Sequence, residues 1–299
     1  MSALKKQEQE EREFLFTRDD FVRIKSLIYR HAGISLSDAK TDMVYSRIGR
    51  RLRALDMLSF KQYLDTLENH NNADEWQAFT NALTTNLTSF FREEHHFPIL
   101  AEHLSKLSAR KPAKPIRIWC SAASTGEEPY SIAITACEAF NTLKPPVEII
   151  ATDIDTNVLA TAAAGVYPLD RIKKMEDARV RKFFERGTGK HDGLVRVKKA
   201  VRELIHFHQL NLLDTQWPFH DGFDVIFCRN VMIYFDKPTQ GKIIDKFVTL
   251  MHEDSLLLAG HSENFLYVSD HLQLLGKTVY KLKTSGAARS SLFTHRKST

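Results

Sequence analysis

The sequence is poor in cysteine, with three in 299 residues. Cys120, Cys137 and Cys228 are too few and too widely spaced for a disulfide framework or a zinc pattern, which favours a reducing cytosol. No apolar run reaches the roughly 18 residues that a membrane span needs. The N-terminal stretch MSALKKQEQEEREF also lacks the apolar core of a signal peptide. We therefore expect a cytoplasmic protein without membrane insertion.

Glycine is scarce where a phosphate-binding loop would need it. After the apolar run Ile116–Cys120, residues 121–126 read Ser-Ala-Ala-Ser-Thr-Gly, with one glycine and no Gly-Lys-Ser/Thr ending. Several glycines are needed before bare backbone N–H groups can surround a pyrophosphate, so a P-loop is excluded and a dinucleotide is disfavoured. A nucleoside without phosphate, such as S-adenosylmethionine, fits this loop better.

The same region has the order of a nucleoside-binding α/β unit. The first apolar run leads into the loop, a helix is predicted to open near Gly126, and a second run, Val147–Thr152, ends on Asp153. An acid at that position can accept hydrogen bonds from ribose hydroxyls. Glu127 and Glu128 would attract an ammonium or sulfonium group, although acids also suit an ordinary helix start. This segment alone leaves both interpretations open.

The composition is that of a folded, soluble protein of one large domain or two modest ones. Hydrophobic residues make up 43% and charged residues 26% of the chain. The net charge of +5 and the pI near 9.0 permit an acidic partner without requiring nucleic acid.

Hydrophobic periodicity divides the chain. Residues 17–85 are predicted to form a small all-helical N-terminal domain, in which Thr17 and Ser59 open capping boxes. Strand–helix alternation over 116–283 predicts a mostly parallel sheet covered on both faces. The expected boundaries are a disordered tail at 1–16, the helical domain at 17–85, a linker region at 86–115 with a helix at 90–110, the sheet domain at 116–283 and a tail at 284–299.

Three features complete the predicted sheet domain. Further strands are expected at Phe223–Cys228 and Ser255–Gly260, and a hairpin of Leu272–Leu275 with Val279–Leu282 adds an antiparallel edge. An antiparallel β-subdomain is predicted as an insertion at about 184–209. Its predicted strands are the β-type runs Gly193–Val197 and Leu204–His208.

Polar residues at strand ends are the candidate ligand contacts. Arg229 and Asn230 follow a buried strand and are predicted to face the same crevice as Asp153. A strand-end cap is the alternative for Asn230, and Asn211 alone indicates only a turn. In the segment NLTSFFR at 86–92, the polar side chains taken singly are better explained by ordinary packing than by a site.

Basic residues gather at Arg47, Arg50, Arg51 and Arg53. The first three share one face of a helix, which is either a solvated face or a docking surface for an acidic partner. The segment Gly260–Phe265 resembles a catalytic cluster, but no Gly-x-Ser-x-Gly elbow occurs and we interpret His261 as structural. No metal site is expected.

Taken together, these segments resemble the CheR-type chemotaxis receptor methyltransferases, which are S-adenosylmethionine-dependent protein-glutamate O-methyltransferases. The resemblance covers roughly residues 17–283. It implies a class I, Rossmann-like α/β methyltransferase domain with an antiparallel edge, plus the helical domain and the inserted β-subdomain. The segments that carry it are NLTSFFRE at 86–93, CSAASTGEEPYS at 120–131, ATDID at 151–155, RGTGKHDGLVRV at 186–197, NLL at 211–213, FCRNVMIYF at 227–235 and AGHSENF at 259–265.

The resemblance also implies roles for single residues. The expected contacts of S-adenosylmethionine and its product S-adenosylhomocysteine are Asn86, Thr88, Arg92, Glu128, Asp153, Asn211, Leu212, Arg229 and Asn230. Gly187, Gly189 and Arg196 match the version of the β-subdomain that grips a C-terminal peptide of the receptor. The tails fall outside the match.

The implied reaction is methylation of glutamates on the cytoplasmic helices of chemotaxis receptors. A glutamate, with a pKa of about 4.3, is already ionised at neutral pH and needs no general base. Arg92 and Tyr234 are the candidate catalytic residues, and the basic helix is the candidate docking surface. A nucleic-acid methyltransferase and a non-catalytic cofactor-binding scaffold remain as alternatives. We expect a monomer.

Overall fold

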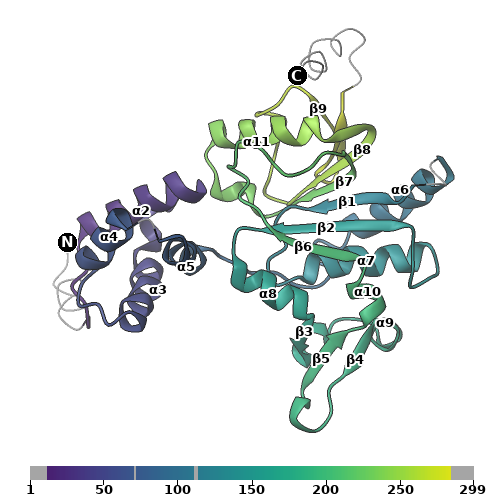
Figure 1. Cartoon of the computed structure of the whole chain (residues 1–299). Coiled ribbons are helices and arrows are strands. Elements are labelled where there is room, and N and C mark those ends of the chain that lie inside the picture. Colours follow the sequence, from purple (N-terminus) through teal and green to yellow (C-terminus); the bar gives the residue numbers. More distant parts are fainter. Residues whose placement is uncertain (1–11, 71, 111–113, 284–299) are drawn as a thin grey trace.

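A computed structural model describes residues 12–70, 72–110 and 114–283. A helical domain stands beside a seven-stranded sheet, and a three-stranded sheet extends from the sheet domain on another side (Figure 1). The predicted C-terminal tail lies outside the described residues, as do most of the N-terminal tail and residues 111–113 of the linker region. None of the described helices has the length and apolar character needed to cross a membrane.

The helical domain is organised by capped amphipathic helices. The predicted capping box at Thr17 is confirmed, because its hydroxyl accepts the Asp20 N–H at 3.1 Å and Asp20 accepts the Thr17 N–H at 2.9 Å. Ser59 caps its helix, but the Gln62 side chain accepts from Leu58 instead. The helices bury their apolar faces in one core. They are α2 (Arg18–Ala32), η1 (Asp38–Lys40), α3 (Thr41–Ala54), α4 (Phe60–Asn69) and α5 (Ala73–Leu83).

The large sheet has the strand order β6-β2-β1-β7-β8-β10-β9. Neighbours from β6 to β8 are parallel, and β10 pairs antiparallel with β8 and β9, so the predicted antiparallel edge is confirmed. The strands are β1 (Ile116–Cys120), β2 (Val147–Asp153), β6 (Ile205–Gln209), β7 (Phe223–Cys228), β8 (Met251–Ala259), β9 (Leu272–Gly276) and β10 (Val279–Leu282).

Helices cover both faces of this sheet, because successive strand residues point to opposite sides. On β1, Trp119 packs with Phe247 of one covering helix, whereas Ile118 and Cys120 belong to the core on the other face. The helices of this domain are α6 (His96–Arg110), α7 (Glu127–Ala139), α8 (Thr156–Ala164), α10 (Lys199–Arg202) and α11 (Lys237–Thr249), with the 3₁₀ turn η4 (Met232–Tyr234).

One of the two strands predicted for the β-subdomain belongs to the large sheet instead. The run Leu204–His208 does not pair within the insertion, because β6 adds to the edge of the large sheet beside β2. The small sheet has the order β3-β5-β4 and recruits a strand that precedes the predicted boundary. Its elements are β3 (Val166–Pro168), η2 (Leu169–Ile172), α9 (Asp177–Phe183), β4 (Phe184–Arg186), η3 (Gly189–His191) and β5 (Leu194–Val197).

The strand order places a crevice at the carboxyl ends of the central strands of the large sheet. The chain runs outward from β1 to β2 and β6 on one side, and to β7 and β8 on the other. Loops leaving β1 and β7 therefore diverge to opposite faces at their carboxyl ends. This is where an open α/β sheet binds a ligand, and it is where the polar strand ends of the sequence meet.

Candidate functional site

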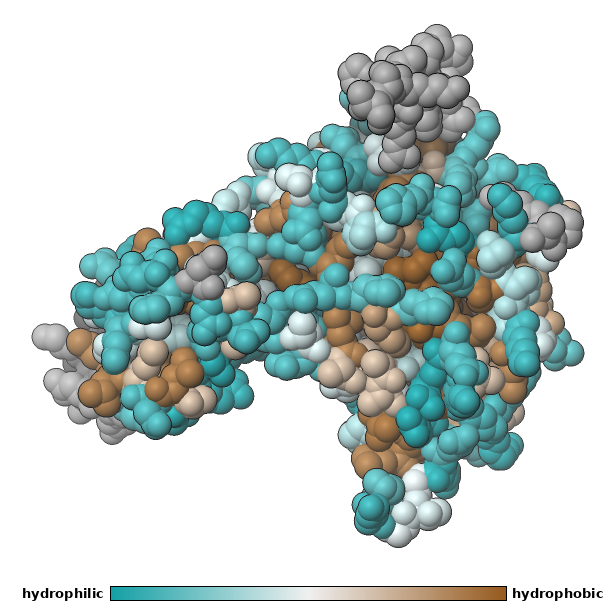
Figure 2. Space-filling view, in the orientation of Figure 1, coloured by the Kyte–Doolittle hydropathy of each residue, from teal (hydrophilic) through white to brown (hydrophobic). Residues whose placement is uncertain are grey.

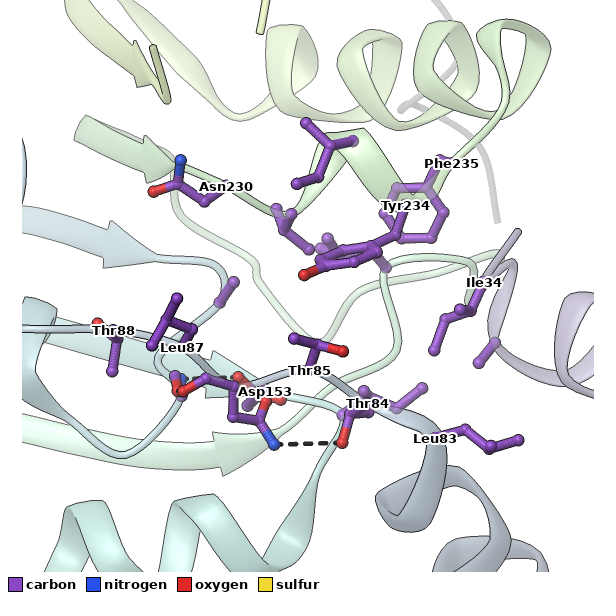
Figure 3. Close-up of a pocket in the computed structure, with 18 of the residues that line it drawn as sticks. Ile34, Leu83, Thr84, Thr85, Leu87, Thr88, Asp153, Asn230, Tyr234 and Phe235 are labelled. Carbon is purple, nitrogen blue, oxygen red and sulfur yellow. Dashed lines mark hydrogen bonds between the residues drawn. The ribbon is translucent and has the colours of Figure 1, made fainter. Parts of the chain in front are cut away.

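A cavity of about 480 Å³ lies at the carboxyl ends of β1, β2 and β7. Its volume falls within the range of roughly 300–1,000 Å³ that is usual for small-molecule sites. Asp153 and Thr88 lie on one side, Asn230 and Tyr234 on the other, and Ile34 reaches in from the helical domain (Figure 3). Tyr234 and every residue predicted to bind the cofactor line it: Asn86, Thr88, Arg92, Glu128, Asp153, Asn211, Leu212, Arg229 and Asn230. The role of each stays a prediction.

Asp153 sits at the end of β2 with both carboxylate oxygens engaged by backbone. One oxygen accepts the Ser124 N–H at 2.8 Å and the other the Asp155 N–H at 3.0 Å. Each oxygen keeps a second lone pair, so the group can still accept from ribose hydroxyls. Burial raises the pKa of Asp153 to about 6, despite these hydrogen bonds, which favour the charged form.

A buried ion network closes the floor of the cavity. The Arg229 side chain has no solvent exposure, and it donates to Glu128 at 2.6 Å and lies 3.3 Å from Glu93. Burial raises the pKa of Glu128, with the Arg229 charge opposing the shift. Burial is also the largest influence on Glu93, but the Arg229 charge and the hydrogen bonds to this carboxylate together outweigh it and lower its pKa. Two carboxylates on one guanidinium give this floor an excess of acidic groups, which suits a cationic ligand.

The linker between the domains is fixed to the sheet by one carboxylate. Thr84 and Asn86 donate to the same Asp155 oxygen, at 2.6 and 2.8 Å. The other Asp155 oxygen caps α8, and the Asn86 carbonyl accepts from Ser124 at 3.0 Å. The Asn86 side chain is therefore a linker anchor, which leaves its backbone and the neighbouring Thr88 to face the cavity.

Two predicted contacts are engaged in local structure. Arg92 donates to the Leu87 carbonyl at 2.9 Å, which folds its side chain over the linker. Asn211 donates to the His31 carbonyl of the helical domain at 2.9 Å and accepts the Leu213 N–H at 2.9 Å. The Asn211 amide thus joins the two domains, and the backbone around Leu212 is the part of this pair best placed for a ligand.

The helical domain supplies cavity residues that the sequence did not indicate. Ser35 donates its N–H to the Tyr234 carbonyl at 2.9 Å, and Tyr29 donates to Asp236 at 2.6 Å. The segment that follows the helix-ending Gly33 carries no ligand-type pattern, so only its packing against the β7 loop identifies it. Its lining residues are Ile34, Ser35, Leu36, Ser37, Lys40 and Met43.

The three arginines predicted to share one face of a helix lie on one surface. Arg47, Arg50 and Arg51 line a second groove, of about 710 Å³, between α3, α5 and α8. Arg47 donates to the Ala82 carbonyl at 3.2 Å, and burial lowers its pKa. Arg51 pairs with Glu75.

Arg53 and Arg50 differ from Arg47 and Arg51 in their partners. Arg53 pairs with Glu13 at 2.8 Å and does not line the groove. Arg50 is exposed and has no ion-pair partner among the described residues. It is therefore the member with a charge that is still available to a partner.

The predicted peptide contacts lie on the three-stranded sheet, outside the cavity. A Cβ at Gly187 would come within 2.0 Å of the His191 carbonyl oxygen, so only glycine fits there. Gly189 has a positive φ of 59°. Arg196 is exposed on the central strand β5, between Val166 and Glu185 of the edge strands.

One cluster consists of residue types that bind metal ions and lie close enough together to share one. Glu93, His95 and His96 offer atoms that lie within 4.8 Å of one another. Glu93 is already shared with Arg229, so a metal ion would have to compete with a guanidinium for it. The cluster is better explained as part of the floor network.

Known proteins match the chain along almost its whole length. A family model described as CheR methyltransferase, all-alpha domain, matches residues 19–84, and one described as CheR methyltransferase, SAM binding domain, matches residues 86–281. Chemotaxis protein methyltransferase 2 of Pseudomonas aeruginosa is 50% identical over 268 residues, which is 90% of this chain and 94% of the relative. Chemotaxis protein methyltransferase of Salmonella typhimurium is 52% identical over 267 residues, 89% of this chain and 91% of the relative.

A solved structure gives a much weaker match. A glycopeptide N-methyltransferase complexed with S-adenosylmethionine aligns over 61% of this chain and 64% of its own, with 12% identity and a TM-score of 0.31. A likeness at that level carries no functional argument.

The raised pKa of Asp153 leads to a prediction for cofactor binding. Because we expect ribose hydroxyls to donate to the ionised carboxylate, the affinity for S-adenosylhomocysteine should fall as the pH drops through about 6, the pKa of Asp153. The loss should approach about tenfold for each pH unit below it. Calorimetry from about pH 8 to about pH 5 measures this. Asp153→Asn should bind more weakly but without this slope, and an equal slope in that variant would assign the titration to another group.

Proposed function

Because this chain belongs to the CheR methyltransferase family, we propose that it methylates glutamate side chains of chemotaxis receptors. It is an S-adenosylmethionine-dependent methyltransferase that acts on chemoreceptors in chemotaxis adaptation. What we propose is the identity of the acceptor, a glutamate carboxylate, and of the products, a glutamate methyl ester and S-adenosylhomocysteine. The three cysteines are free thiols, which supports a reducing cytoplasm as its location.

The cavity residues fit S-adenosylmethionine. Asp153 offers free lone pairs for the ribose, and the single-glycine loop 121–126 has no cradle for phosphate. The floor network, with two carboxylates on one guanidinium, suits an amino acid that carries a sulfonium. When bound there, S-adenosylmethionine supplies an electrophilic methyl group.

The presence of both signs of charge in the cavity lining carries the proposal for a carboxylate acceptor. Asp153 and Glu128 come from the sheet and α7, at the cofactor side. Lys40 comes from the helical domain and Arg92 from the linker, and both line the same cavity. A site with anions for a cationic cofactor and cations for the second substrate favours an anionic acceptor over an amine or a base of nucleic acid.

The reaction needs alignment more than proton transfer. The glutamate oxygen attacks the methyl carbon, the carbon–sulfur bond breaks, and its electron pair stays on sulfur. The carboxylate, with a pKa of about 4.3, gives up no proton at neutral pH. What the chain contributes is an in-line approach of roughly 3 Å and the exclusion of water. Leu87 and Ile233, which line the cavity and are 79% and 51% exposed, offer an apolar rim for this.

Two side chains are placed to orient the acceptor. Arg92 is partly exposed on the linker, and its bond to the Leu87 carbonyl leaves further guanidinium donors. Tyr234 lines the opposite wall, with its hydroxyl directed into the cavity (Figure 3). A neutral hydroxyl holds a carboxylate without the strong ion pair that would reduce its nucleophilicity.

One assay separates the proposed function from its alternatives. The protein is incubated with methyl-labelled S-adenosylmethionine and receptor-bearing membranes, and base is then added. Release of volatile methanol indicates a carboxyl ester, as we expect. Base-stable label indicates N- or C-methylation, the outcome expected of a nucleic-acid methyltransferase supplied with nucleic acid. No label on any acceptor indicates a cofactor-binding scaffold.

Tyr234→Phe should lower turnover by about tenfold to a hundredfold, since it removes one oriented hydrogen bond in the transition state. Its affinity for S-adenosylhomocysteine should stay within about threefold of the wild type. The matched control is Tyr267→Phe, because Tyr267 is 85% exposed and lies outside the cavity. Arg92→Ala should lower both turnover and cofactor affinity. Unchanged turnover in both cavity variants, with cofactor bound, would remove their catalytic roles.

The docking of the receptor is proposed for the groove that Arg47, Arg50 and Arg51 line. Figure 2 shows the molecule hollowed between the helical domain and the three-stranded sheet, which leaves room for an elongated partner. Receptor methylation helices are rich in glutamate, and such a surface suits a basic groove. Since Arg47 and Arg51 are engaged within the protein, Arg50 is the residue whose charge acts outward.

Arg50→Glu should raise the KM for receptor by about tenfold and weaken its dependence on salt. Cofactor affinity and melting temperature should not change, because Arg50 is exposed and makes no ion pair among the described residues. Lys61→Glu, the same charge reversal on an exposed residue of α4 outside the groove, is the control. Equal losses in both variants would assign the effect to net charge and not to the groove.

A receptor peptide is proposed to add a strand to the three-stranded sheet. The edge strands β3 and β4 each pair on one side only, with β5. A flexible tether would raise the local enzyme concentration towards the millimolar range. Calorimetry with the receptor's C-terminal peptide should show binding that Arg196→Glu weakens and Lys199→Glu does not. No binding by the wild-type protein would exclude the tether.

A further inference from the structure

The segment Gly260–Phe265, which follows β8, holds a buried carboxylate that the reaction does not use. Glu263 is 4% exposed. One of its oxygens accepts the Asn230 N–H at 2.9 Å and the Gly260 N–H at 2.5 Å. The other accepts the N–H groups of Val231 and Met232, at 3.0 and 2.8 Å. One side chain therefore binds three consecutive backbone amides of the β7 loop.

These amides begin the loop that forms one wall of the cofactor cavity. Asn230 has a φ of 57°, a left-handed conformation that side-chain-bearing residues rarely adopt. The chain turns there from β7 into η4, and this turn brings Ile233 and Tyr234 to the cavity. Without an external partner, the N–H groups of this turn would be buried and unpaired.

The absence of a side chain at Gly260 allows the Glu263 carboxylate to approach the β7 loop. A Cβ at this position would lie 2.6 Å from the Asn230 Nδ2 atom and 2.7 Å from a Glu263 oxygen. Both distances are shorter than real contacts allow, so any larger residue would displace the bond between the carboxylate and the loop. The glycine and the glutamate of this segment thus serve the same contact.

Burial raises the pKa of Glu263, and the backbone N–H groups that it accepts from oppose this shift. Among the described residues no ion pair involves it, and backbone N–H groups are what compensate its burial. A buried carboxylate held in this way is costly compared with an apolar side chain of similar size. A carboxylate is, however, the side chain that can accept from four converging donors at once.

We propose that Glu263 is a positioning residue, which holds the loop Arg229–Phe235 in the conformation that binds cofactor and orients the acceptor. It acts through Asn230, whose left-handed turn it fixes, and touches neither substrate itself. The inference rests on the proposed role of this loop in the site. Cofactor binding and amide exchange need no receptor, so they test it independently of the glutamate acceptor.

Glu263→Gln should weaken binding of S-adenosylhomocysteine by about tenfold, because an amide can accept from only part of the four donors. Hydrogen exchange at the amides of residues 230–232 should speed up by at least about tenfold. Calorimetry and NMR on the full chain measure the two effects. Asp224→Asn is the matched control, since Asp224 is a buried carboxylate near the start of β7 that accepts the Arg117 N–H at 3.0 Å. It should lower stability and leave cofactor affinity within about twofold.

A double-mutant cycle distinguishes positioning from general stability. Glycine adopts a positive φ freely, so Glu263→Gln should cost much less affinity in an Asn230→Gly background than in the wild type. Equal costs in both backgrounds, or wild-type affinity and exchange in folded Glu263→Gln, would overturn the proposal. If Glu263→Gln does not fold, Gly260→Ala provides the same test by displacing the carboxylate. Wild-type affinity in folded Gly260→Ala would also overturn it.

Discussion

The site depends on one buried guanidinium. The Arg229 side chain is fully buried, and it binds Glu128 of α7, Glu93 of the linker region and the Arg92 carbonyl, the last at 2.6 Å. A buried charge must be paired, and removing Arg229 would leave both carboxylates without a cation. Three segments that are distant in sequence are therefore held together at the floor of the cavity. The excess of one carboxylate also gives this floor the sign that a sulfonium cofactor requires.

Much of this organisation was predictable because strand ends in an open α/β sheet converge. Asp153, Arg229 and Asn230 were inferred as neighbours from their positions after apolar runs, and they line one cavity. The single-glycine loop likewise indicated a ligand without phosphate. Local sequence was sufficient here, because the sheet itself supplies the long-range geometry.

The sequence was insufficient where partners are set by tertiary packing. The run Leu204–His208 reads as a hairpin strand beside glycine-rich turns, but the longer register available beside β2 draws it into the large sheet. The sequence identified Asn211 and Arg53 as polar positions, but it did not indicate that they would bind the His31 carbonyl and Glu13. Ile34 and Ser35 follow a helix end and carry no chemical signature, so their place in the cavity wall depends on the docking of two domains.

The cavity wall crosses the boundary between the two family domains. Gly33 packs so closely against Leu213 and Phe235 that a Cβ there would come within 2.9 and 3.0 Å of them, and Ser35 donates to the backbone of Tyr234. Exchanging helical domains between relatives to transfer receptor preference would therefore cut through the catalytic pocket. A chimaera that preserves this wall must take the segment 33–37 and the loop 230–236 from the same parent.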